Sequence, residues 1–182
     1  GKNLKYFGDG YQISKKIDNR RFWRIPVMDG EFVCEEKTAR VPAIGGGNFL
    51  LLSKNRASCL AACEIAVNVM SKLDNIITPF PGGVVRSGSK VGSKYKALIA
   101  STNDAFCPSL KGITGSKLSK DVSAVMEIVI NGLTKEDIDK AIRESLIAIS
   151  KSKYKKDILS VSAGNYGGKL GQYHFHLRDI LK

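Results

Sequence analysis

The strongest secondary-structure signal begins with Val125-Met126-Glu127-Ile128-Val129-Ile130-Asn131-Gly132. The β-branched residues of this run favour a strand, and the Asn-Gly pair favours a turn at its end. Thr134 and Asp137 have the spacing of a capping box, which predicts that a helix begins at Thr134. The apolar face of this helix consists of Ile138, Ala141, Ile142 and Ile149. We therefore expect a strand followed directly by an amphipathic helix.

Three further segments build a sheet around this pair. Residues 48–52 are a short apolar run after three glycines, which fits a buried strand, and residues 158–162 have the pattern of another. Residues 53–73 should form a helix, because Leu60, Cys63, Val67 and Met70 recur at intervals of three and four. With a strand in the region 75–103, the order strand, helix, strand, strand, helix, strand is the split βαβ arrangement. The sequence therefore predicts an α+β fold.

Both ends of the chain are expected to add strands. Residues 22–33 contain two apolar runs on either side of Asp29-Gly30, which is the pattern of an antiparallel hairpin. Residues 173–177 should form a strand near the end of the chain. We expect residues 1–44 to form a hairpin region that leads into a lobe at residues 45–182.

The composition excludes several classes of protein. The chain has 182 residues, a formal net charge of +12, 43% hydrophobic and 25% charged residues, which is typical of a globular domain rather than a disordered, fibrous or membrane protein. It has neither the ~18 consecutive apolar residues of a membrane helix nor the apolar core of a signal peptide. Its four cysteines are scattered, so they predict neither a disulfide scaffold nor a zinc site. We expect an intracellular protein with reduced thiols.

Glu127 is the candidate catalytic residue. It shares one strand face with Val125, Val129 and Asn131, whereas Met126 points to the other face. A carboxyl that is removed from water there would hold a proton and act as a general acid or a hydrogen-bond donor. The alternative is a solvated sheet face, or a Glu127 paired with a lysine, and strands with one wet face are common.

Other candidate motifs carry weaker signals. The run 162–171 is rich in glycine but departs from the phosphate-binding loop pattern, so it predicts a turn that could still face an anion. His174 and His176 would share a strand face, but no neighbouring ligands complete a metal site, and we predict none. The lysines of 151–156 are expected to face water. In contrast, the segment 75–103 lacks Asp and Glu and carries several cations.

Seven motifs occur together in one order along the chain. They are Phe7-Gly8-Asp9-Gly10-Tyr11-Gln12, Gly46-Gly47-Asn48-Phe49, Pro79-Phe80-Pro81-Gly82-Gly83, Ser89-Lys90-Val91-Gly92-Ser93-Lys94, Ala100-Ser101-Thr102-Asn103-Asp104-Ala105, Glu127-Ile128-Val129-Ile130-Asn131-Gly132-Leu133, and the glycine-rich run from Ser162 to Tyr173. In order and approximate spacing they resemble the formylmethanofuran:tetrahydromethanopterin formyltransferases. The resemblance extends from residue 4 to the end of the chain and covers the C-terminal, or proximal, lobe of that family. The family's N-terminal lobe has no counterpart here, and we expect it in a companion chain or in a lost fragment.

The resemblance implies a function and an assembly. Members of the family transfer a formyl group between formylmethanofuran and N5 of tetrahydromethanopterin without a prosthetic group. Their lobes are ferredoxin-like, and the enzymes are cytoplasmic homo-oligomers, commonly tetramers. Glu127 matches the glutamate at the reacting formyl group, where a neutral carboxyl would stabilise the tetrahedral oxyanion and protonate the leaving amine.

The resemblance also implies the substrate-binding residues. Both coenzymes are anionic, so the acid-free segment is the expected binding region, with Lys90 and Lys94 as anion contacts. The other expected substrate-binding residues are Ser93, Asn103, Asp104, Asn131, Gly82 and Gly83. The basic composition differs from that of methanogen enzymes and points to bacterial formaldehyde oxidation, with a hydrolase complex as partner.

Two alternatives remain at this point. A basic ferredoxin-like sheet could bind nucleic acid, but residues 125–130 lack the aromatic side chains on which bases stack. The lobe could also be catalytically silent and serve only assembly.

Overall fold

The computed structural model describes residues 10–88, 103–113, 115–164 and 171–182. The chain forms two compact units, Gly1–Pro42 and Ala43–Lys182, and each is described by itself. Among the helices in the described ranges, none combines the length and the apolar character that a membrane crossing needs.

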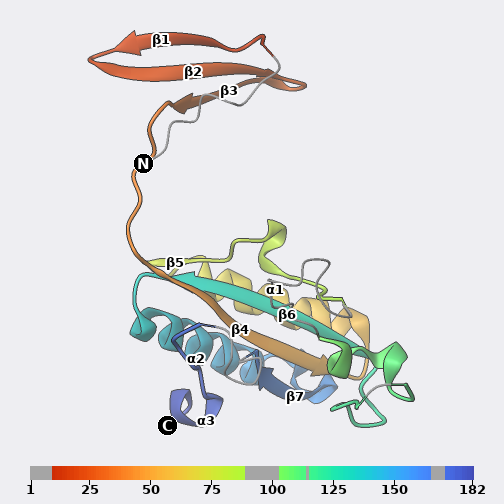
Figure 1. Ribbon diagram of the computed structural model, residues 1–182. Coiled ribbons are helices and arrows are strands. Elements are labelled where there is room, and N and C mark those ends of the chain that lie inside the picture. Colours follow the sequence, from red (N-terminus) through yellow and green to blue (C-terminus); the bar gives the residue numbers. More distant parts are fainter. Residues whose placement is uncertain (1–9, 89–102, 114, 165–170) are drawn as a thin grey trace. The chain divides into compact units, whose positions relative to one another are not determined.

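The first unit contains a three-stranded antiparallel sheet. Its strands are β1 (Ile13–Ile17), β2 (Arg20–Val27) and β3 (Gly30–Glu35), in the order β1-β2-β3 (Figure 1). The predicted antiparallel hairpin is confirmed, but its turn consists of Met28 and Asp29, because Gly30 begins β3 and pairs with Val27. Arg20 and Glu35 form an ion pair across β2 and β3 with an N–O distance of 2.5 Å. This pair is exposed to solvent and therefore contributes little to stability.

The second unit contains a four-stranded antiparallel sheet and two long helices. Its elements are β4 (Ile44–Ser53), α1 (Arg56–Met70), β5 (Ile76–Ile77), β6 (Ala124–Gly132), α2 (Lys135–Lys151) and β7 (Ile158–Ala163). The strand order is β5-β6-β4-β7, and both helices cover the same face of the sheet (Figure 1). The predicted split βαβ arrangement of an α+β fold is therefore confirmed.

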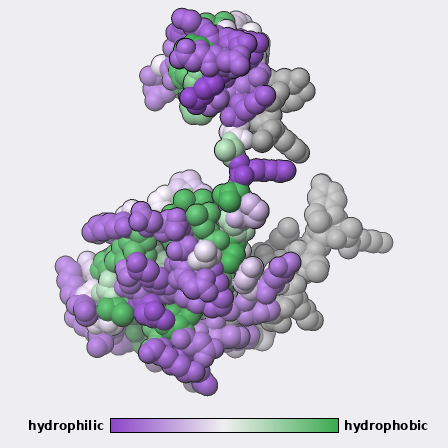
Figure 2. Space-filling view, turned by 90° about the vertical axis from the view of Figure 1, so that its left-hand side faces the viewer, coloured by the Kyte–Doolittle hydropathy of each residue, from purple (hydrophilic) through white to green (hydrophobic). Residues whose placement is uncertain are grey.

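Short helical turns complete the second unit. They are η1 (Pro81–Gly83), η2 (Asp104–Phe106), η3 (Pro108–Leu110), η4 (Lys153–Asp157) and the four-residue helix α3 (Leu177–Ile180). On the face shown in Figure 2, hydrophobic residues lie among hydrophilic ones over this unit.

The core lies between the sheet and the two helices. Phe49 and Leu51 of β4 pair with Ile128 and Met126 of β6, so these four side chains share the face that the helices cover. Helix α1 adds Cys59, Ala62, Cys63 and Ala66, and helix α2 adds Ile138, Ala141, Ile142 and Ile149. The alternation of a strand then directs Leu50 and Glu127 to the opposite face, which neither α1 nor α2 covers.

The predicted capping box at the start of α2 is present. Thr134 Oγ1 accepts a hydrogen bond from the amide of Asp137 at 3.1 Å, and the Asp137 carboxyl accepts one from the amide of Thr134 at 3.1 Å. The Thr134 hydroxyl also donates to Asp137 Oδ2 at 2.9 Å, so Thr134→Ala removes two hydrogen bonds and should lower the free energy of unfolding by about 1 kcal/mol. Urea denaturation measures this loss. Ser150→Ala, at an exposed position late in the same helix, is the control and should change stability by less than about 0.5 kcal/mol; equal losses in both variants would contradict the capping role.

The predicted strand at residues 173–177 is wrong. Residues 173–176 pair with no strand among the described residues, and α3 begins at Leu177. Phe175 is 3% exposed and belongs to the main core cluster. This aromatic side chain anchors the segment by burial, which needs no backbone ladder.

Candidate functional site

Glu127 lies in the middle of β6 and is almost completely buried. Its exposed fraction is 2%, although neither α1 nor α2 covers the sheet face to which it points. Leu50 of β4 is its direct cross-strand neighbour. The surroundings of Glu127 thus differ from the solvated sheet face that the strand pattern alone left open.

Polar side chains of the described residues contact the Glu127 carboxyl. Asn48 donates from Nδ2 to Oε1 at 2.8 Å, and Asn103 donates from Nδ2 to Oε2 at 3.2 Å. The hydroxyl of Ser87 also contacts Oε2. The Glu127 carboxyl is thus both buried and in contact with polar side chains.

Backbone pairing brings Ser87 to this carboxyl. The amide of Val85 donates to the Glu127 carbonyl at 2.8 Å, and the amide of Glu127 donates to the Val85 carbonyl at 2.9 Å. The residues around Val85 therefore pair antiparallel with β6, along the edge of β6 that does not pair with β4. Ser87, two residues after Val85, therefore returns to the face on which Glu127 lies.

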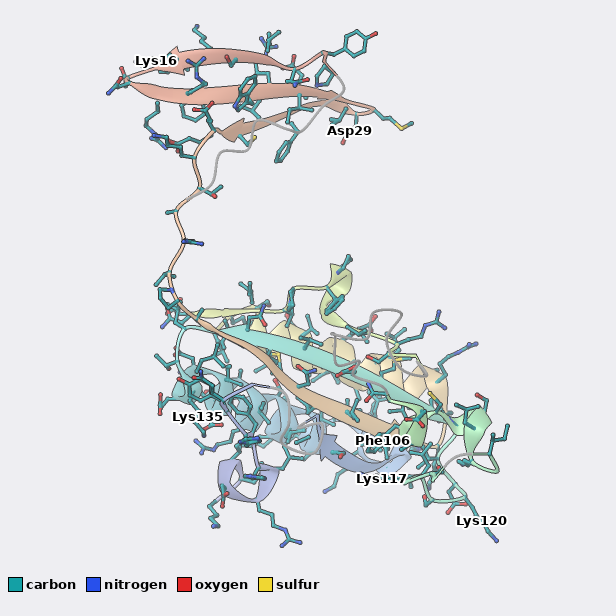
Figure 3. All side chains as sticks on the ribbon, in the orientation of Figure 1. Lys16, Asp29, Phe106, Lys117, Lys120 and Lys135 are labelled. Atoms are coloured by element: carbon teal, nitrogen blue, oxygen red, sulfur yellow. The ribbon has the colours of Figure 1, made fainter. Side chains whose placement is uncertain are left out.

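A small apolar cluster positions Asn103. Phe106 and Leu118 pack on Leu50 and Leu52, on the face of the sheet that carries Glu127. Asn103 precedes η2, and its carbonyl accepts a hydrogen bond from the amide of Phe106 at 2.9 Å. Figure 3 shows Phe106 and Lys117 close together at the end of β4, where the Lys117 ammonium lies 5.9 Å from the ring centroid of Phe106. The cluster thus fixes the turn from which Asn103 reaches Glu127.

Asn131 lies on the same face as Glu127, four residues further along β6. Its Oδ1 accepts a hydrogen bond from the amide of Gly46 at 3.0 Å. A Cβ at Gly45 would lie 3.4 Å from the same oxygen. Asn131 therefore ties the irregular start of β4 to β6 and borders the face on which Glu127 lies.

The predicted glycines lie in η1, which packs on α1. Gly83 has a φ of 72°, and a Cβ there would approach Val67 Cγ2 to 2.7 Å. Gly82 also has a positive φ, of 67°. Both conformations favour glycine, and Gly83 in addition allows close contact with the helix. The hydrogen bonds of the described residues do not connect either glycine to the Glu127 side chain.

The remaining predicted site residues fall into two groups. Asp104 is the first residue of η2, half-buried and next to Asn103. Lys90, Ser93 and Lys94 lie outside the described residues. The geometry thus brings together Glu127 and Asn103, with Asp104 and Asn131 nearby.

Sequence reasoning missed Asn48 and Ser87 as partners of Glu127. Asn48 belonged to the Gly46-Gly47-Asn48-Phe49 motif and began the apolar run at 48–52, and its alternation with Leu50 could have placed both on one face. Ser87 gave no signal, because its position depends on the isolated bridge at Val85.

Other candidate chemistry lies away from Glu127. His174 and His176 stack with their ring centroids 6.4 Å apart, and no group of three or more His, Cys, Asp or Glu in the described residues is arranged to hold a metal. Contact with the Cys59 thiol, and burial, raise the pKa of Cys63, so this thiol stays neutral in the core. The lysines of 151–156 are exposed, and the centre of the glycine-rich run, 165–170, is outside the described residues.

Comparison with protein families identifies two matching models. Residues 30–180 match the model described as the proximal lobe of FTR. Residues 1–27 match the model of formylmethanofuran-tetrahydromethanopterin formyltransferase. Together the two models account for almost the whole chain.

Individual relatives agree with these models. The chain is 62% identical over 181 residues to a formylmethanofuran–tetrahydromethanopterin formyltransferase from Methylobacillus flagellatus, and 60% identical over 181 residues to the one from Methylococcus capsulatus. A solved structure, the formyltransferase/hydrolase complex from Methylorubrum extorquens with methylofuran, matches with 48% identity and a TM-score of 0.71 over 97% of this chain. The present chain covers 60% and 61% of the two relatives and 59% of the solved chain.

Proposed function

The chain belongs to the formylmethanofuran-tetrahydromethanopterin formyltransferase family, and we propose that it provides the catalytic carboxyl for formyl transfer between formylmethanofuran and N5 of tetrahydromethanopterin. The observation that carries this proposal is the burial of Glu127, 2% exposed, among polar side chains on the sheet face that α1 and α2 leave uncovered. Named formyltransferases of high identity support the reaction class.

The reaction moves one formyl group from one nitrogen to another. The pterin amine attacks the formyl carbon, the C=O π electrons move to the oxygen, and this oxygen accepts a hydrogen bond from neutral Glu127. Glu127 then gives its proton to the leaving nitrogen as the old carbon–nitrogen bond breaks, and it takes a proton from the newly acylated nitrogen. The protons balance, because the hydrogen lost from N5 ends on the released amine.

The contacts of Glu127 support this cycle. Oε2 contacts Asn103 and Ser87, and Oε1 contacts Asn48. In the proposal, these amide donors stabilise the carboxylate after the proton has left. These contacts support the proposed role of Glu127 in proton transfer.

Substrate binding extends the proposal to further residues. Asn103 is in hydrogen-bond contact with Glu127, and Asp104 and Asn131 lie beside the same face. In the proposal, Lys90, Ser93 and Lys94 bind the anionic groups of the coenzymes. Two lysines within five residues supply the positive charge that such groups favour.

The partners of the chain form part of the proposal as well. The chain spans about 60% of its relatives' length, and we propose that it acts in a homo-oligomer together with the family's N-terminal lobe. A relative from Methylorubrum extorquens, 47% identical to this chain, is named as a component of a formyltransferase/hydrolase complex. By analogy, we place this chain in an assembly with a hydrolase.

Retention of coenzyme on ultrafiltration tests the proposed function. If the proposal holds, the protein in its native assembly should retain tetrahydromethanopterin and should not retain a nonspecific RNA. The same preparation should transfer formyl groups from formylmethanofuran. Retention of RNA without retention of the pterin would overturn the proposal in favour of a nucleic-acid-binding module. A protein that retains no pterin and transfers no formyl group would also overturn it, in favour of a lobe that serves only assembly.

A further inference from the structure

The Asn48 amide makes one side-chain hydrogen bond within the described part of the chain. Nδ2 donates to Glu127 Oε1 at 2.8 Å, whereas Oδ1 is buried and accepts no hydrogen bond from the described residues. Asn131, in contrast, is tied to a backbone amide by its Oδ1. Among the groups that the structure describes, the carboxyl of Glu127 therefore sets the orientation of the Asn48 amide.

An amide with one such bond can reverse. Rotation about the Cβ–Cγ bond exchanges the oxygen and the nitrogen, and this terminal torsion has two broad minima of similar energy. In either orientation one amide atom lacks a hydrogen-bond partner among the described residues. The free-energy cost of this unpaired atom is therefore similar in both orientations and largely cancels. The preferred orientation then depends on whether Glu127 Oε1 accepts or donates.

We propose that Asn48 is a reversible positioning residue for the proton of Glu127. This inference rests on the proposed function. When Glu127 is ionised, Asn48 Nδ2 donates to Oε1. When Glu127 is protonated, the amide turns, Oδ1 accepts the hydrogen of Oε1, and Asn103 continues to donate to Oε2. Asn48 thus holds the proton on Oε1 before reaction and stabilises the carboxylate after the proton has moved to substrate.

Few charged groups surround this pair in the described residues. Neither β4 nor β7 carries an ionisable side chain, and Glu127 is the only one in β6. On the other described segments, Arg86 lies between Val85 and Ser87, Asp104 follows Asn103, Lys117 lies over the Phe106 ring, and Lys111 donates to the carbonyl of Val122. Substitutions at Asn48 leave these groups unchanged, so a change in pH dependence would report on the pair itself.

Two variants of Asn48 separate a reversible partner from a fixed donor. Asn48→Leu removes both the donor and the acceptor. It therefore removes the hydrogen bond that would stabilise ionised Glu127 and the one that would stabilise protonated Glu127. We expect kcat/KM to fall about tenfold, with the alkaline limb of its pH profile displaced by less than about 0.5 pH units. Asn48→Asp provides an acceptor and a second negative charge, so it favours protonated Glu127 and should move the alkaline limb upward by about one to two units.

The matched controls are Asn68→Leu and Asn68→Asp, at an exposed position of α1, which should leave the profile unchanged. In the Glu127→Gln background, the effect of Asn48→Asp on the alkaline limb should disappear. An equal upward shift in Asn48→Leu and Asn48→Asp would overturn the proposal and show a fixed donor. An unchanged rate in Asn48→Leu would also overturn it. Full activity of Glu127→Gln with Asn48 intact would instead refute the proposed function, so the two failures are distinguishable.

Discussion

Glu127→Gln is expected to lower kcat for formyl transfer by about 10²- to 10⁴-fold, which is the usual contribution of a general acid. Glutamine keeps the size of the side chain and can still donate one hydrogen bond, but it cannot release a proton to the leaving amine. Formyl transfer by the protein in its native assembly, measured at saturating coenzymes, gives this ratio.

The fold should survive this substitution. The introduced amide can accept a hydrogen bond from Asn103 and donate one to the Oδ1 of Asn48, because that oxygen accepts no hydrogen bond from the described residues of the parent protein. Thermal unfolding should therefore differ little from that of the parent protein. Glu64→Gln, at an exposed position of α1, is the matched control and should retain full activity. Full activity in Glu127→Gln would refute the acid role.

Ile138→Ala is expected to cause the largest loss of stability, about 2–5 kcal/mol. Ile138 is fully buried, and it fills the space left by two glycines: a Cβ on Gly47 would lie 2.5 Å from its Cγ2, and a Cβ on Gly132 would lie 2.7 Å from its Cγ1. Paired strands cannot move inward to close the space that alanine would leave, so most of the cavity would persist. Urea denaturation measures the change in the free energy of unfolding.

Ile147→Ala is the matched control on the same helix. Its side chain is 42% exposed, and its loss should cost less than about 1 kcal/mol. Similar losses in the two variants would show that α2 does not pack through Ile138 as the structure places it.

Local signals predicted most of the second unit. The capping box at Thr134 and the strand around Glu127 depend on neighbours within a few residues, so the sequence shows them directly. The helix α1 was predicted as well, but of its expected apolar face Cys63 and Met70 are buried whereas Leu60 is exposed. The prediction of a strand at 173–177 was wrong because a long-range contact, and not a local pattern, determines this segment. Its alternating pattern is local, but burial of Phe175 in the core decided its conformation.

The candidate site was only partly predictable. The strand pattern and the family resemblance identified Glu127, and the resemblance identified Asn103. The hydrogen bonds of Asn48 and Ser87 to the same carboxyl come from elements 79 and 40 residues away. No local pattern specifies such a contact.

The sequence by itself determined the main strands and helices of the second unit, their order and the family of this protein, because periodicity, capping and motif order are properties of the chain. Only the tertiary structure decided that Glu127 is buried and not solvated, and that its Oε1 contacts Asn48. The register of β4 against β6 and the bridge at Val85 create that environment. Strand register is set by the packing of whole faces against helices, and a shift of one residue would turn Glu127 into the apolar core.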